Sequence, residues 1–134
     1  MDVGFGMEVK ICGITSPSDA LMCIRAGADA LGLVFYPKSP RIVTDIEARA
    51  VADAVSGAVP LVGVFVNEPV PDVLAHARAS GIGWAQLHGR ETPEDVAELK
   101  ARGLKVIKVL FYNREPLFSR HVLYRPDAFL VECA

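Results

Sequence analysis

The sequence alternates short apolar runs with segments of helical periodicity, and this alternation constrains the fold more than any other feature. The apolar runs lie at 8–12, 30–35, 61–66, 84–87, 104–110 and 128–132. Most are continuous and rich in β-branched residues, a pattern typical of strands buried on both faces of a parallel sheet. We therefore predict an α/β fold of consecutive βα units in which a helix covers each strand.

The segments between the apolar runs carry signals for helix starts and helix ends. Three of them begin with a side chain that can cap a helix, followed by a first-turn proline or an acidic residue three positions on. These signals are Ser16 with Pro17, Thr44 with Glu47, and Thr92 with Pro93 and Asp95. Glycines typical of helix C-termini follow at Gly27, Gly57, Gly81 and Gly103.

The number of units points to part of a larger closed sheet. Eight units of this size need roughly 190 to 200 residues, near the lower limit for a (β/α)₈ barrel. The 134 residues supply five full units and a sixth strand, with no helix after it. We expect one domain over 1–134 that is a C-terminally incomplete barrel, or one whose last strand is covered by another chain.

Composition narrows the class of partner. Lys and Arg number 14 against 16 Asp and Glu, and the net charge of −2 disfavours a nucleic-acid or membrane-surface binder. No apolar run reaches the roughly 18 residues of a membrane helix, and a signal-peptide pattern is missing. The three cysteines form no CxxC pair, which favours free thiols in a reducing compartment. We expect a cytoplasmic protein.

Candidate functional residues follow from the rule that parallel βα folds place their chemistry at the carboxyl ends of strands. Cys12 ends the first apolar run just before a helix start, a position that favours the thiolate form of a nucleophile or base, although buried cysteines are also common as small core residues. Lys38 and Arg41 lie in a proline-bounded loop and can bind a carboxylate, or they are solvated surface charges.

Two further strand ends carry polar side chains. Gln86 and His88 flank Leu87, so they point to the same side of their strand, toward a pocket or only toward a local helix cap. Glu132 closes an apolar strand, where loss of hydration would raise its pKa and suit it to act as a general acid, unless it is solvated. Cys23 fits the core, and we assign Cys133 no role.

Four motifs occur in order at these strand ends. They are KICGIT at 10–15, GLVFYPKSPR at 32–41, VGVFVN at 62–67 and QLHG at 86–89. With the LVE run at 130–132, they extend over nearly the whole chain, and in combination they resemble the phosphoribosylanthranilate isomerases of tryptophan biosynthesis. The resemblance implies a (β/α)₈ barrel and an Amadori rearrangement of N-(5-phosphoribosyl)anthranilate to 1-(2-carboxyphenylamino)-1-deoxyribulose 5-phosphate. It implies a small phosphorylated substrate, with no metal or organic cofactor.

The resemblance also assigns roles to individual residues. Cys12 matches the general base of the family and Arg41 the arginine that contacts the anthranilate group, whereas His88 belongs to a motif that lines the pocket. Lys38 and Gln86 are further candidates for substrate binding. The family's general acid is an aspartate at the end of the sixth strand, where this chain has Glu132, whose extra methylene moves the carboxylate by more than about 1 Å. The glycine-rich phosphate loops of the seventh and eighth strands have no counterpart here.

Two other interpretations remain open at this point. One is a non-catalytic barrel fragment that acts as an interaction or oligomerising module through its open strand edges. The other is a related sugar-phosphate isomerase, although such enzymes use paired aspartates and the first strand here ends in Cys12. The native chain starts at Met1 or at Met7, and the residues from Met7 onward resemble the family more closely.

Overall fold

The computed structural model describes residues 6–133 and shows one parallel sheet with the strand order β1-β2-β3-β4-β5-β6. The strands are β1 (Lys10–Cys12), β2 (Ala30–Val34), β3 (Leu61–Phe65), β4 (Trp84–Leu87), β5 (Lys105–Phe111) and β6 (Ala128–Glu132). Each strand pairs with the next one along the chain, so the predicted order of parallel strands is confirmed, but only the first four of the five expected units contain an α-helix within the described residues. Met1 lies outside the described residues, and the choice between Met1 and Met7 stays a prediction.

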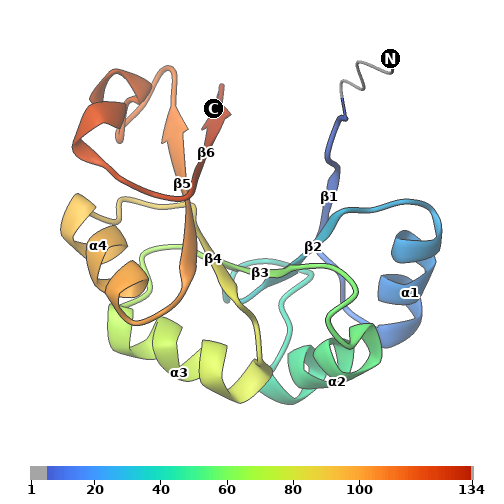
Figure 1. Cartoon of the computed structure of the whole chain (residues 1–134). Coiled ribbons are helices and arrows are strands. Elements are labelled where there is room, and N and C mark those ends of the chain that lie inside the picture. Colours follow the sequence, from blue (N-terminus) through green and yellow to red (C-terminus); the bar gives the residue numbers. More distant parts are fainter. Residues whose placement is uncertain (1–5, 134) are drawn as a thin grey trace.

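The sheet is curved, and its helices lie on the outer face. Figure 1 shows an open arc with α1 (Pro17–Arg25), α2 (Asp45–Val55), α3 (Val70–Ser80) and α4 (Pro93–Ala101) along the outside. The edge strands β1 and β6 lie at the two ends of the arc. The main apolar core fills the space between sheet and helices, where Leu33, Phe65 and Leu87 from the strands pack with Val51 and Val73 from the helices.

Three of the helices begin as predicted. Ser16 caps α1 by accepting from Asp19 N at 3.2 Å. Thr44 and Thr92 form reciprocal capping boxes at the starts of α2 and α4, and each box satisfies backbone N–H groups that have no partner within the helix. Pro69 precedes α3 and makes no side-chain cap.

The glycines after the helices take left-handed backbone angles, as their predicted place at helix ends requires. Gly81 is itself the cap residue of α3, with φ +80°. Gly27, Gly57 and Gly103 follow the cap residues of α1, α2 and α4 by one position and have φ between +77° and +102°. A side chain there would be strained, which explains the choice of glycine.

Several predicted boundaries were wrong by one or two residues, and β1 shows why. The strand begins at Lys10 instead of residue 8 because Val9 N donates to the Asp29 carboxylate at 2.8 Å and not to a strand ladder. β3 ends at Phe65 because the chain then turns at Asn67, where φ is +55°. β5 extends to Phe111, whose partner in the ladder is Glu132.

Burial on both faces holds only for the central strands. β3 is buried along its whole length, whereas β1 and β6 are largely exposed. Phe129 and Val131 of β6 have exposed fractions of 39% and 51%, since no α-helix of residues 6–133 covers them, although the His121 ring lies edge-on to Phe129 at 6.2 Å between ring centres. The segment between β5 and β6 forms the 3-10 helix η1 (Phe118–Leu123), which was not predicted. Within the described residues, no helix is both long enough and apolar enough to cross a membrane.

Candidate functional site

The carboxyl end of β1 is tied to β2 by a tight turn. Gly13 N and Ile14 N both donate to Gly32 O at 3.0 Å, and Gly13 has φ +87°. Cys12 is exposed just before this turn, and its side chain lies over Gly32 of the neighbouring strand. A Cβ on Gly32 would lie 2.8 Å from Cys12 Sγ and 3.1 Å from Lys10 Nζ. The missing side chain at Gly32 therefore makes room for the thiol and the ammonium on the inner face.

Arg41 reaches the same place from the loop after β2. Its Nη1 donates to Cys12 O at 3.3 Å, and a side chain at Gly13 would collide with its guanidinium group. The loop is held by a bridge between Val34 and Ile42 and by a hydrogen bond from Arg41 N to Ser39 Oγ at 3.2 Å. Arg41 and Cys12 thus lie side by side, with the guanidinium group directly against the backbone of residues 12 and 13.

Lys38 does not join this pair. Its side chain is exposed in the loop between β2 and α2, and within residues 6–133 it makes no hydrogen bond or ion pair. The structure gives it no place in the cluster formed by the other candidates.

Gln86, His88 and Glu132 form a connected chain of polar side chains. Gln86 Nε2 lies 3.2 Å from His88 Nδ1, which confirms that the two side chains share one face of β4. His88 Nε2 lies 3.0 Å from Glu132 Oε2 and links β4 to the end of β6. With the amide placed in this way, its NH₂ group donates to Nδ1 and the neutral ring carries its proton on Nε2, directed at Glu132.

This chain can exchange a proton between the carboxylate and the imidazole. The 3.0 Å contact holds one proton, bound either to His88 Nε2 or to Glu132. Gln86 Oε1 is buried and has no hydrogen-bond partner among the described residues. Rotation of the amide would place that oxygen against a protonated Nδ1, so Gln86 can support either tautomer of His88.

Of the two expectations for Glu132, the structure favours the solvated one, because its side chain is 38% exposed at the end of the edge strand β6. Cys23 is partly buried against the core, in line with its predicted structural role. Cys133 is exposed.

A hollow of about 430 Å³ lies at the carboxyl ends of the middle strands. His88 lines it together with Tyr36, Arg90 and Arg114. Phe111 forms part of its wall, with the Arg114 guanidinium group 3.9 Å from the centre of the ring and His88 edge-on at 6.0 Å between ring centres. Arg114 was not among the predicted site residues, because the sequence around it in the loop after β5 has no strand or cap pattern.

A buried ion pair supports the loop that carries His88. The Lys108 side chain is fully buried, and its ammonium group lies 3.0 Å from Glu91 Oε1. Burial lowers the pKa of Lys108, and the neighbouring Glu91 carboxylate acts in the opposite direction. This pair was not predicted, although a lysine inside the apolar run at 104–110 was a visible signal.

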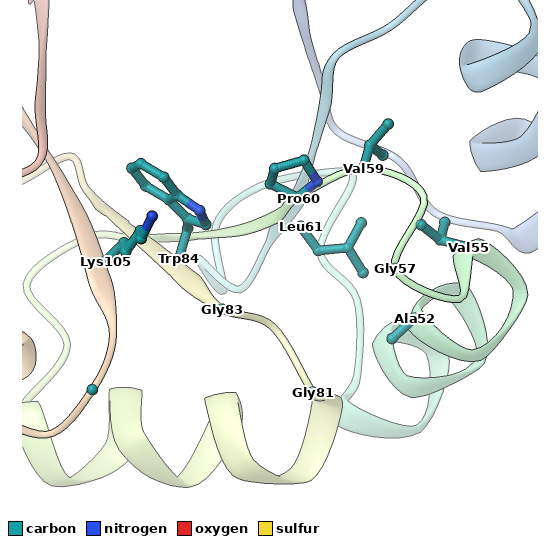
Figure 2. A pocket seen from close by; sticks show the side chains of 11 residues that line it. Ala52, Val55, Gly57, Val59, Pro60, Leu61, Gly81, Gly83, Trp84 and Lys105 are labelled. Atoms are coloured by element: carbon teal, nitrogen blue, oxygen red, sulfur yellow. The ribbon is translucent and has the colours of Figure 1, made fainter.

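The opposite end of the sheet holds a hollow of similar size and different chemistry. This hollow of about 460 Å³ lies near the amino ends of β3, β4 and β5, and Figure 2 shows the side chains that line it. Its lining is mostly apolar or glycine, and the Lys105 ammonium group lies 5.3 Å from the centre of the Trp84 ring. The amino ends of strands in such folds contribute to stability, so we place the functional site at the carboxyl ends.

Metal ligands are not grouped in the part of the chain that the structure describes. Among residues 6–133 there is no group of three or more His, Cys, Asp or Glu side chains that could hold a metal ion. The expectation that no metal or organic cofactor is required stays a prediction.

Comparison with known proteins identifies one family repeatedly. Residues 9–123 match the family model of N-(5'-phosphoribosyl)anthranilate isomerase. The enzyme of that name from Desulfatibacillum aliphaticivorans is 46% identical over 128 residues, which are 96% of this chain and 59% of that protein. The chain thus spans about three fifths of the length of this curated relative.

Solved structures agree with the sequence match. The crystal structure of phosphoribosyl anthranilate isomerase from Thermotoga maritima superposes with a TM-score of 0.88 at 38% identity, covering 96% of this chain and 62% of that one. A second structure, of the isomerase in complex with reduced 1-(o-carboxyphenylamino)-1-deoxyribulose 5-phosphate, gives a TM-score of 0.87 at 38% identity over 96% and 66% of the two chains.

Proposed function

The chain belongs to the N-(5'-phosphoribosyl)anthranilate isomerase family, and from that premise we propose that it carries the base and acid half of an isomerase active site. The reaction is the rearrangement of N-(5-phosphoribosyl)anthranilate to the deoxyribulose phosphate. The observation that supports it most directly is that two contacting pairs, Cys12 with Arg41 and His88 with Glu132, lie at the carboxyl ends of the same curved sheet.

The first chemical step needs an acid beside the sugar ring oxygen. A proton transferred from Glu132 to that oxygen allows the bond between the oxygen and C1 to break, and the lone pair of the anthranilate nitrogen forms the C1 iminium. The leftover carboxylate then accepts a hydrogen bond from His88 Nε2, 3.0 Å away in this structure. His88 is therefore the group that stabilises the carboxylate of the spent acid through this hydrogen bond.

The second step needs a base at C2. Cys12 Sγ takes the C2 proton as thiolate, and the electrons of that C–H bond form the enamine double bond between C1 and C2 while the iminium nitrogen is neutralised. Loss of the enol proton and protonation of C1 give the ketone. We assign to Arg41, which is fixed against the backbone at Cys12, the binding of the anthranilate carboxylate, which would hold C2 beside the thiol.

We also propose that residues 1–134 supply six of the eight strands of a closed barrel in a single domain. The support is the curved six-stranded sheet and the three-fifths coverage of the relative. On this proposal the 5'-phosphate is bound by segments of the seventh and eighth units. The intact mass of the protein from its source cell tests this: a mass near that of roughly 200 residues supports it, and one of 14.4 kDa contradicts it.

The open edges are the basis of a second proposal, which concerns assembly. Ile11 at one edge and Val131 at the other are 38% and 51% exposed. If another copy of the chain covers these edges in place of further strands of the same polypeptide, the sedimentation coefficient will rise with protein concentration. A monomer at all concentrations would contradict self-association through the edges.

The proposed activity can be tested by steady-state kinetics of the protein isolated from its source cell. We expect Cys12→Ala to lower kcat by about 10³-fold, within the range for loss of a general base. Cys23→Ala is the matched control, because Cys23 lies against the core and away from the site, and we expect kcat to stay within about twofold. Equal turnover of the wild type and Cys12→Ala would contradict the proposal.

A further inference from the structure

Lys108 and Glu91 form the most completely buried polar cluster of the described residues, on the helix-facing side of the sheet. The side chains of Lys108 and Glu91 are 0% and 3% exposed. Neither residue lines the hollow that contains His88, because Lys108 and Glu91 lie on the side of the sheet that the helices cover. A buried ion pair is costly to desolvate and is weak evidence for stability alone.

The ammonium group of Lys108 holds the end of β4 through three acceptors. It donates to Gly89 O at 2.9 Å, to Leu87 O at 3.4 Å and to Glu91 Oε1 at 3.0 Å. Leu87 and Gly89 are the two neighbours of His88 in the chain. The backbone on both sides of the histidine is therefore bonded to one rigid strand, β5.

The carboxylate of Glu91 completes the restraint from the other side. Its Oε1 accepts from Gly89 N at 2.8 Å as well as from Lys108, and its Oε2 accepts from Asn67 N at 2.9 Å. Asn67 in turn accepts from Arg90 N at 2.6 Å. The loops after β3 and β4 and the middle of β5 thus meet at one carboxylate.

Gly89 shows how closely this loop is packed. A Cβ at Gly89 would lie 2.9 Å from the backbone nitrogen of Asn67 and closer still to its side-chain amide. His88 N donates to Phe65 O at 2.9 Å, so the histidine itself is fixed to β3. The imidazole then reaches Glu132, 44 residues further along the chain.

We propose that Lys108 and Glu91 are positioning residues for His88: they fix the backbone of residues 87–91 so that the imidazole meets Glu132 in one orientation. The catalytic meaning of this inference rests on the proposed isomerase function, but the structural effect on His88 does not. The pair acts through the loop backbone and touches no reacting atom.

The ring nitrogens of His88 provide a direct test in this chain. With ¹⁵N-labelled histidine at alkaline pH, a held ring gives two separate signals, one from the protonated nitrogen and one from the bare nitrogen. We expect these two signals to merge in the double variant that combines Lys108→Met with Glu91→Gln. A glutamine at position 91 has only one acceptor oxygen for the two backbone N–H donors. His76, whose Nδ1 lies 2.6 Å from Asp45 Oδ1 on other elements, is the internal control and should not change.

A second variant covers the case in which the double variant does not fold. Glu91→Asp keeps both charges of the pair but shortens the carboxylate by one methylene, so it cannot reach all three donors, and we expect the same merging of the His88 signals. The surface pair Arg49–Asp53 supplies the control variant Arg49→Met, Asp53→Asn, which should leave them separate. Unchanged His88 signals in Glu91→Asp, or equal changes at His76, would overturn the proposal.

Kinetics distinguish this proposal from the proposed activity. In the protein as its cell produces it, Glu91→Asp should lower kcat about 10- to 100-fold with KM changed less than about twofold, the effect of misplacing a catalytic group by about 1 Å. In a His88→Asn background the same substitution should change kcat less than about twofold, since both act through one group. If Glu91→Asp also lowered kcat by about 10- to 100-fold in the His88→Asn background, the positioning role would be refuted even if isomerase activity is confirmed.

Discussion

Replacing Gly32 by alanine perturbs the proposed base without altering it chemically. The new Cβ would lie 2.8 Å from Cys12 Sγ and 3.1 Å from Cys12 Cα, whereas ordinary contacts between nonbonded heavy atoms lie at about 3.5 to 4.0 Å. The backbone atom belongs to the paired strand and can yield only a few tenths of an ångström. The thiol is exposed and must move by roughly 1 Å to relieve the contact.

The expected cost follows from that displacement. A shift of about 1 Å in a positioned catalytic group corresponds to about 10² in kcat, and the added methyl group should cost about 1 kcal/mol of unfolding free energy, the lower end for overpacking, because Sγ can rotate outward. We therefore expect Gly32→Ala to be folded and about 100-fold slower in the isomerase assay. Urea unfolding monitors the free energy in parallel.

Two other glycines supply matched controls for Gly32→Ala. Gly83 has open space where its Cβ would lie, so Gly83→Ala should leave both kcat and stability nearly unchanged. A Cβ at Gly63 would collide with Ile82 on the outer face, so Gly63→Ala should lose about 1 to 3 kcal/mol of stability with little change in kcat. A Gly32→Ala protein with kcat within about threefold of the wild type would refute the placement of the reactive Cys12 thiol over Gly32.

Three further predictions concern the acid, the buried cluster and a helix cap. Glu132→Gln should lower kcat by about 10²- to 10⁴-fold, whereas Glu132→Asp, which keeps a carboxylic acid at this position, should retain more than about a tenth of it; equal losses in the two variants would contradict the acid role. The Tyr124 hydroxyl donates to Glu91 O, and burial raises the pKa of Tyr124 above its ordinary value of 10.0. The contribution of this hydroxyl to stability is therefore present below pH 10.0, and it is lost as the pH rises through the higher pKa of the folded state. The difference in unfolding free energy between wild type and Tyr124→Phe should therefore shrink above that pH, and a difference that grows would contradict the pKa direction. Thr44→Ala should cost about 1 kcal/mol in urea unfolding through loss of the capping box at α2; no change would show that the cap contributes nothing.

Local patterns in the sequence predicted the features that depend on neighbouring residues. The alternation of side chains along a strand placed Gln86 and His88 on one face, and their contact at 3.2 Å confirms it. Cap residues such as Thr44 and Thr92 marked helix starts correctly because a capping box lies within four residues of chain. The order and direction of the strands followed from the length of the helical segments between them.

Features that depend on distant residues could not be predicted in the same way. The contact between His88 and Glu132 joins positions 44 residues apart, and the pair of Lys108 with Glu91 joins positions 17 apart. Neither spacing corresponds to a helix or strand period, so hydrophobic pattern carries no information about them. The exposure of Val131 agrees with the expectation of an uncovered sixth strand, although an apolar pattern does not show what covers that face.

Binding of the reduced product analogue tests the central claim most directly, because it locates the site independently of turnover. In the protein as its cell produces it, saturation with reduced 1-(o-carboxyphenylamino)-1-deoxyribulose 5-phosphate should shift the ring signals of His88. The signals of His76 on α3 and of His121 in η1 should stay in place. An analogue that binds and leaves His88 unchanged while it shifts His76 or His121 would contradict the placement of the active site at the carboxyl ends of the sheet.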